Sequence, residues 1–228
     1  MDRKPSPARG EPTREALVRA AIEIFGRDGF DAASTRAISD AASVNQALIG
    51  YHFGGKPGLY LAALRFIAAS VSARLGPLVD SVEAQLAADG EARRGKKIAE
   101  RSLAALQGLL EAFVAMLTSD ESAAWARLIL REQQNPSDGF DVLYEGFMHR
   151  ILGVASELIA RAQNRGASAA DCRLTAFTII GQAVVFRAAR ACVMREMQWR
   201  QLGARELDGI QAQLRRNIAA IVQAEPSR

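Results

Sequence analysis

Residues 34–60 have the sequence STRAISDAASVNQALIGYHFGGKPGLY, which contains two short helical patterns separated by a tight turn. The first pattern starts after Ser34, because serine is a preferred residue for capping a helix N-terminus. The turn is Ser43-Val44-Asn45. The second pattern spans Asn45–Phe53 and stops at Gly54-Gly55, since glycine adopts the left-handed conformation that ends many helices. Two short helices joined by such a turn predict a helix-turn-helix.

The leading turn of the second helix has side chains that suit the edges of DNA bases. Asn45 and Gln46 can each make two hydrogen bonds to adenine, and Ala47 can contact a thymine methyl group. Gly50 leaves room where the helix would lie close to the duplex. Side chains at the edges of the motif are placed to contact phosphates. The predicted DNA-binding residues are Ser34, Thr35, Arg36, Asn45, Gln46, Ala47, Gly50, Tyr51, His52 and Lys56.

Pattern alone leaves a second interpretation open, because helix pairs with polar tips are common in helical proteins. The net charge of the chain is +4, which is compatible with nucleic-acid binding but does not establish it. The first sixty residues hold eight Lys and Arg against seven Asp and Glu. A DNA-binding surface there must therefore come from where the charges lie. The alternative is a ligand-independent helical binding or scaffold protein without DNA readout.

The remainder of the chain also shows helical periodicity, with no strand pattern and no repeat. We therefore expect an all-α fold of about nine or ten helices. Apolar residues make up 49% of the chain, which is enough for a sizeable core. The expected helices after the motif include 57–75, a shorter piece after Pro77, 138–163, 169–197 and 206–223.

Catalytic and metal-binding patterns are not found. The two histidines, His52 and His149, have no metal-ligand spacing, and no nucleophile elbow or phosphate-binding glycine loop occurs. Cys172 and Cys192 lie in apolar helical patterns, which favours a core role over a redox role. The sequence therefore predicts no enzyme, no cofactor and no metal site.

The most apolar window, Ala176–Met194, is nearly long enough to span a membrane. It contains Gln182, Arg187 and Arg190, and two arginines within a span cost several kcal/mol (about 2.5–3.5 each at the centre). We therefore expect a buried helix of a soluble protein without a membrane partner. The N-terminus has no apolar stretch typical of a signal peptide, so the expected location is cytoplasmic.

Three groups of residues near the motif occur together in a known family. They are Gly29-Phe30, the run of Ile38, Ala41, Ala42 and Val44, and Y-H-F-x-x-K-x-x-L-Y from Tyr51 to Tyr60. In combination they resemble the N-terminal domain of TetR-type transcriptional regulators over residues 13–62. Two positions depart from the family pattern. Ser43 replaces the usual turn glycine, so we expect a less strained φ there, and Gly50 stands where many members have a bulky residue.

The rest of the chain is similar to the C-terminal domain of the CecR-like branch of these regulators. The similarity rests on Trp125–Ser137, on the segment FDVLYEGFMHRI after it, and on Gly181–Arg190. It implies an effector-binding, dimer-forming helical domain in a family of mostly repressors. The expected organisation is a disordered basic arm at 1–12, a helix-turn-helix domain at 13–56 and a helical effector-binding and dimerisation domain at 57–224.

This resemblance implies a ligand-responsive repressor that binds a palindromic DNA operator as a homodimer and is released by a small molecule. Polar and aromatic residues on apolar helices make up the expected effector site: Trp125, Arg131, Tyr144, Phe147, Gln182, Phe186 and Arg187. If arginines line it, an anionic effector is favoured. The open alternative for Arg131 and Arg187 is an internal packing role, such as an ion pair of Arg187 with Glu132, Asp141 or Glu145. The dimer is expected to use the helices at 169–197 and 206–223, with 138–163 as the competing helix.

Overall fold

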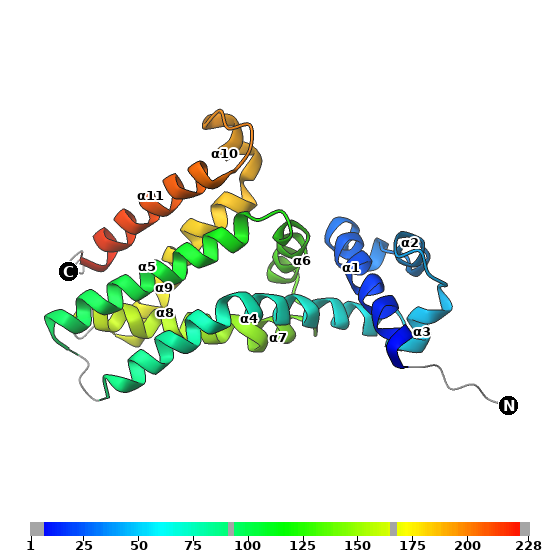
Figure 1. The fold of residues 1–228 in the computed structure, drawn as a ribbon, viewed down its shortest axis with the longest axis horizontal. Coiled ribbons are helices and arrows are strands. Elements are labelled where there is room, and N and C mark those ends of the chain that lie inside the picture. Colours follow the sequence, from blue (N-terminus) through cyan, green and yellow to red (C-terminus); the bar gives the residue numbers. More distant parts are fainter. Residues whose placement is uncertain (1–6, 91–93, 165–167, 224–228) are drawn as a thin grey trace. The chain divides into compact units, whose positions relative to one another are not determined.

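The computed structural model describes residues 7–90, 94–164 and 168–223, and every regular element in these ranges is helical (Figure 1). The predicted all-α class is therefore confirmed. In order, the elements are α1 (Pro7–Ala32), α2 (Thr35–Ala41), α3 (Ala47–Phe53), α4 (Lys56–Ala88), α5 (Lys96–Thr118), α6 (Ser122–Gln134), α7 (Phe140–Leu143), the π-helical turn η1 (Tyr144–Met148), α8 (His149–Ala162), α9 (Ala169–Ala188), α10 (Arg190–Glu196) and α11 (Ala204–Gln223).

Several helix boundaries differ from those expected. Helix α1 begins at Pro7, so residues 7–12 of the predicted disordered arm are helical, while residues 1–6 lie outside the described residues. Pro77 lies inside the single helix α4 and does not separate two helices. The expected helix at 169–197 is two helices, because Ala189 leaves the helical conformation at φ −105° and ψ 26°.

The described chain forms two compact units. The first unit runs through Ser70 and also includes Ala124–Gly146, and the second contains Val71–Ala123 and the chain from Phe147 onward. The first unit thus extends beyond residues 13–56 and takes in most of α6, all of α7 and the start of the π turn. Helix α4 contributes residues to both units.

Local signals fix the two helices of the motif. The Ser34 hydroxyl oxygen accepts a hydrogen bond from the Ala37 N–H at 3.0 Å, which is the expected N-cap of α2. Gly54 ends α3 in the left-handed conformation at φ 72°. Ile38 is fully buried in α2. The buried residue of α3 is Ile49, and the adjacent Leu48 is only half-buried.

The turn between α2 and α3 contradicts the expectation for Ser43. Its φ is 57°, in the left-handed region that glycine adopts without steric cost. The serine therefore adopts a conformation in which its Cβ approaches the following carbonyl oxygen.

The core of the first unit is built from α1 and the first half of α4. Leu17, Phe25, Leu59 and Leu64 are fully buried. The Phe25 ring meets the Tyr60 ring edge to face, with centroids 4.9 Å apart. Gly29 interrupts α1 at φ 83°, a left-handed conformation that glycine adopts readily.

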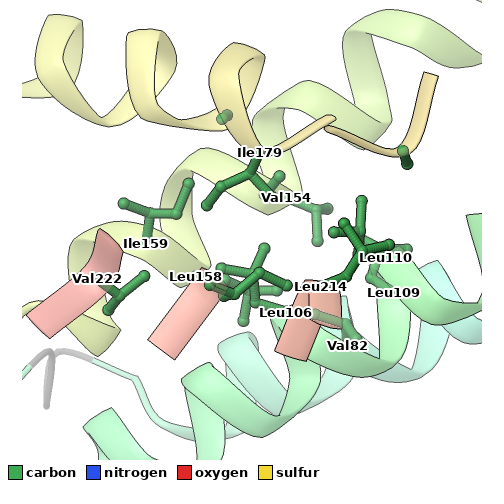
Figure 2. Close-up of a cluster of buried hydrophobic side chains, with 14 of the residues drawn as sticks. Val82, Leu106, Leu109, Leu110, Val154, Leu158, Ile159, Ile179, Leu214 and Val222 are labelled. Carbon is green, nitrogen blue, oxygen red and sulfur yellow. The ribbon is translucent and has the colours of Figure 1, made fainter. Parts of the chain in front are cut away.

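The second unit is a helical bundle whose core is shared by α4, α5, α8, α9 and α11. Figure 2 shows the buried cluster, which includes Leu106 and Leu110 of α5, Leu158 of α8, Ile179 of α9 and Leu214 of α11. These side chains are each at most 3% exposed. Burial of this apolar surface is the main stabilising contribution to the bundle.

Three helices, α4, α5 and α9, are long and apolar enough to cross a membrane by length and composition alone. In α4 and α5, 44% and 39% of the most apolar window is buried inside the structure, whereas in α9 only 22% is buried. Helix α9 therefore presents apolar surface that its own chain does not cover.

Candidate nucleic-acid interface

One face of α3 is exposed and the opposite face anchors the helix. Gln46, Ala47, Gly50 and Tyr51 are all exposed, while Ile49 is 2% exposed. Residues separated by three or four positions share a helix face, so Ala47, Gly50 and Tyr51 form one continuous outward stripe. The structure therefore places the predicted base-contacting residues on the solvent side of the motif.

Hydrogen bonds at the start of α3 give the two amide side chains different roles. The Asn45 Oδ1 atom accepts from the Ala47 backbone N–H at 2.8 Å, which satisfies a free donor at the start of the helix. The Gln46 Nε2 atom donates to the Thr35 Oγ1 atom at 2.7 Å and joins the starts of α2 and α3. Asn45 is thus held against its own backbone, whereas Gln46 is held by the neighbouring helix.

The phosphate-contacting candidates differ in how freely they are presented. Arg36 is 83% exposed, and its nearest described partner is Asp40, with Nε and Oδ2 3.8 Å apart. A pair so long and so exposed contributes little stability, so the guanidinium is available to an external anion. Tyr51 is 72% exposed and stacks edge to face on His52 with centroids 5.0 Å apart.

Lys56 is the candidate with the strongest internal contacts. Its Nζ atom donates to the Asp31 carbonyl oxygen at 3.1 Å and lies 4.7 Å from the centroid of the Phe30 ring. The cation therefore closes the end of α1 onto the start of α4. Lys56 therefore contributes to the packing beneath the surface of the motif. Two of its three N–H donors remain for other acceptors.

Helix α6 is attached to the end of α1 by arginines. Arg131 donates from Nε to the Gly26 carbonyl oxygen at 3.1 Å and from Nη2 to the Arg27 carbonyl oxygen at 2.8 Å. These carbonyls lie just before the break at Gly29, where a helix has no internal donors for them. One turn earlier in α6, Arg127 pairs with Glu23 at 2.7 Å. In this structure the Arg131 guanidinium caps a helix, which supports the packing alternative for this residue.

A buried carboxylate completes the attachment of α6. Glu132 is 2% exposed and accepts hydrogen bonds from the Tyr60 hydroxyl and from the Ser137 hydroxyl and N–H, the last at 3.2 Å. Burial raises the pKa of the Tyr60 phenol above its ordinary value, and the hydrogen bond to Glu132 raises it further. No local sequence pattern indicates this cluster, although Tyr60 is the last residue of the motif Tyr51–Tyr60.

The seven effector candidates do not fall in one compact unit. Trp125, Arg131 and Tyr144 belong to the first unit, and Phe147, Gln182, Phe186 and Arg187 belong to the second. Within the first unit Trp125 is 5% exposed and Tyr144 stacks on Phe140 at 5.9 Å.

Arg187 also binds a helix end. Its Nε atom donates to the Leu117 carbonyl oxygen at 2.5 Å, and its Nη2 atom donates to the Ser119 carbonyl oxygen at 2.5 Å and the Ser122 hydroxyl at 3.0 Å. These contacts are hydrogen bonds to backbone carbonyls and a hydroxyl, as expected for an internal packing role of Arg187. Arg187 thus holds α9 to the turn between α5 and α6.

The described cavity of the second unit has an apolar lining that contains none of the seven candidates. It lies between α5, α8 and α9, has a volume of about 20 Å³, and is lined by Leu106, Leu109, Leu110, Phe113, Ile151, Ala155, Ile179 and Ile180. Gln182 instead accepts from the Asn217 amide of α11 at 2.8 Å, and Phe186 packs on the core cluster. A gap of this size has room for about one water molecule, and its apolar lining offers such a water no hydrogen-bond partner.

In the described ranges, no group of three or more His, Cys, Asp or Glu side chains is arranged to hold a metal ion. The surface around α3 instead presents hydrogen-bonding and cationic side chains.

Comparison with known proteins agrees with this geometry. The family described as bacterial regulatory proteins, tetR family, matches residues 17–63, and the C-terminal domain of the HTH-type transcriptional dual regulator CecR matches residues 103–225. The chain belongs to the TetR family of transcriptional regulators, with a CecR-type C-terminal domain. Members of this family bind DNA and are not enzymes, as predicted.

Individual members of the TetR family resemble the chain over nearly its whole length. CecR of Shigella flexneri is 28% identical over 222 residues, which is 96% of each chain. Among solved structures, the fatty acid degradation regulator FadR of Bacillus halodurans is 17% identical with a TM-score of 0.56, covering 99% of this chain and 100% of that one. FadR of Bacillus subtilis in complex with stearoyl-CoA is 12% identical with a TM-score of 0.58, covering 93% and 99%.

Replacing Tyr60 with phenylalanine tests the buried cluster. At neutral pH we expect the free energy of unfolding to fall by about 1–3 kcal/mol, because Glu132 stays buried and loses a donor. Since the Tyr60 pKa is raised in the folded state, the unfolded chain loses the phenol proton first, at about pH 10, and wild-type stability falls as pH rises further. The difference in the free energy of unfolding between wild type and Tyr60→Phe should therefore become smaller above about pH 10.

The measurement is chemical denaturation followed by circular dichroism across this pH range. Tyr51→Phe is the matched control, because Tyr51 is 72% exposed and should change stability by less than about 0.5 kcal/mol. If the free energies of unfolding of wild type and Tyr60→Phe differ by the same amount at all pH values, the raised pKa of Tyr60 does not contribute to the pH dependence of stability.

Proposed function

We propose that this protein is a cytoplasmic, ligand-responsive transcriptional repressor that binds a palindromic operator as a homodimer. The observation that supports DNA readout is the exposed face of α3. It presents Gln46, Ala47, Gly50 and Tyr51 outward on a helix anchored by buried Ile49. A short helix with small and amide side chains on its outer face can enter the major groove and contact base edges.

The proposed DNA contacts divide into two groups. Gln46, Ala47 and Gly50 face the bases, with Asn45 at the entry to the groove. Contacts to phosphates come from the surrounding side chains, which set the register of the protein on the duplex. This second group is Ser34, Arg36, Tyr51, His52 and Lys56, while Thr35 is hydrogen-bonded to Gln46 at the start of α2.

A second copy of the chain is the proposed cover for the outer face of α9. Leu174, Phe177 and Val185 are 66%, 58% and 44% exposed, and Gly181 lies between them on the same side of the helix. Residues at these spacings form one apolar stripe along the helix. A two-fold dimer would bury the stripe against its own copy, and it would supply the paired recognition helices that a palindromic operator requires.

The proposed effector is a small molecule with an apolar body that enters the second unit between α5, α8 and α9, where the apolar gap of about 20 Å³ has to open to admit it. The all-apolar lining supports this chemistry, and the Arg131 and Arg187 guanidinium groups are already bound to carbonyl oxygens. The stearoyl-CoA bound by FadR of Bacillus subtilis is a ligand with such a body. To move the protein from mostly bound to mostly released, the ligand must favour the released state by about 5.5 kcal/mol.

Titration with DNA from the region upstream of its own gene tests the central proposal. We expect saturable binding whose affinity falls steeply with salt, because phosphate contacts release counterions. Arg36→Ala should lower the slope of log affinity against log salt by about one. The control Arg205→Ala changes an exposed cation on α11 and should leave the slope unchanged. An absence of duplex binding at low salt would favour the scaffold alternative.

Sedimentation velocity tests the dimer. The double variant Leu174→Arg/Phe177→Arg places two positive charges on the apolar stripe. Burial of each charge in the dimer interface would cost roughly several kcal/mol. We expect wild type to sediment as a dimer at micromolar concentration and the double variant as a monomer. Glu100→Arg on the exposed side of α5 is the control and should remain dimeric. A double variant that stays dimeric would remove α9 from the interface.

Thermal shift with stearic acid and stearoyl-CoA tests the effector site. We expect these ligands to raise the melting temperature of the wild type by mass action and to release operator DNA. Ala155→Leu enlarges a 3% exposed side chain that lines the cavity and should reduce the shift by about half or more through overpacking. Ala104→Leu on the exposed side of α5 should retain the full shift. Equal shifts of the melting temperature in wild type and both variants would exclude the cavity as the ligand-binding site.

A further inference from the structure

Thr35 and Gln46 connect the two helices of the motif through their side chains. Thr35 is the first residue of α2, and Gln46 immediately precedes α3. The Gln46 Nε2 atom donates to the Thr35 Oγ1 atom at 2.7 Å across eleven residues of sequence. Thr35 is half-buried, whereas Gln46 is exposed. The half-buried side chain thus holds the exposed one in place.

This bond leaves the Gln46 amide with the groups that adenine requires. A primary amide has two N–H donors and a carbonyl oxygen that accepts. One N–H is bound to Thr35, so one N–H and Oε1 remain. In the major groove, adenine presents the N7 acceptor and the N6 amino donor side by side, which match this remaining pair.

The neighbouring amide does not have the same freedom. Asn45 accepts from the Ala47 N–H with its Oδ1 atom at 2.8 Å, so its amide is held against the backbone at the start of α3 and one of the two lone pairs of Oδ1 is in use. Around Gln46 the helix surface is small. Ala47 adds one methyl group, and a Cβ added at Gly50 would meet nothing within 4 Å. The Gln46 amide is therefore the longest polar group at the start of this face.

We propose that Gln46 specifies adenine at one position of each operator half-site and that Thr35 is the positioning residue that orients its amide. This inference rests on the proposed DNA-binding function. Long side chains lose rotamer freedom on binding, so an amide already fixed in the free protein binds with a smaller entropic cost. Thr35 accordingly acts through Gln46 and not as a phosphate contact.

Selection of binding sites from a random duplex library, with the full-length protein, tests this assignment. The variants are Gln46→Ala, Thr35→Val, which has the same shape without the hydroxyl acceptor, and Thr35→Ser, which retains it. We expect Gln46→Ala to lose about tenfold or more of the preference for adenine at one position per half-site. Thr35→Val should lose about threefold to tenfold at that same position, and Thr35→Ser should match wild type.

Affinity for a non-specific duplex separates positioning from phosphate contact. We expect Thr35→Val to keep wild-type non-specific affinity and salt dependence, because only orientation of the amide is lost. A uniform loss over all sequences would identify Thr35 as a phosphate contact and overturn the proposal, as would an unchanged preference in Gln46→Ala. If wild type selects no sequence at all, the proposed DNA-binding function itself fails. Circular dichroism melting of each variant confirms that the fold is retained.

Discussion

The DNA-binding surface depends on the burial of one aliphatic side chain in each of two seven-residue helices. Helices of this length are not stable alone in water, so α2 and α3 exist because Ile38 and Ile49 are removed from solvent. Every outward residue of α3 takes its direction from that packing. Apolar burial alone does not fix how α2 and α3 are oriented relative to each other. Two polar and backbone features add this orientation: the hydrogen bond between Thr35 and Gln46, and the left-handed turn at Ser43.

A second constraint is the need to satisfy polar groups at helix ends. Arg131 binds the last carbonyls before the break in α1, and Arg187 binds those at the end of α5. Both were expected on the basis of charge to favour an anionic ligand. Because a buried carbonyl without a donor is costly, the structure uses these guanidinium groups internally. The cavity between α5, α8 and α9 has an apolar lining, which favours an effector with an apolar body over an anionic one.

The sequence was sufficient to predict the fold class, the cap at Ser34, the stop at Gly54 and the exposure of the α3 face, because these follow from local residue chemistry. It could not predict that Ile49 and not Leu48 is buried, since adjacent aliphatic residues differ only by the rotation of a short helix. The strained φ of Ser43 was missed because tertiary packing overrides the preference of one residue. The cluster of Tyr60, Glu132 and Ser137 joins positions more than seventy residues apart, which no local pattern contains.

The π turn at Tyr144–Met148 has a consequence for the direction of the side chains that follow it. A π turn accommodates one more residue than the α-helical path it interrupts, and each residue advances a helix by about 100°. The number of residues in this turn therefore sets which face of α8 carries Val154 and Leu158, both buried. Removing one residue from the turn would rotate the following side chains by about 100° and carry these two away from the core.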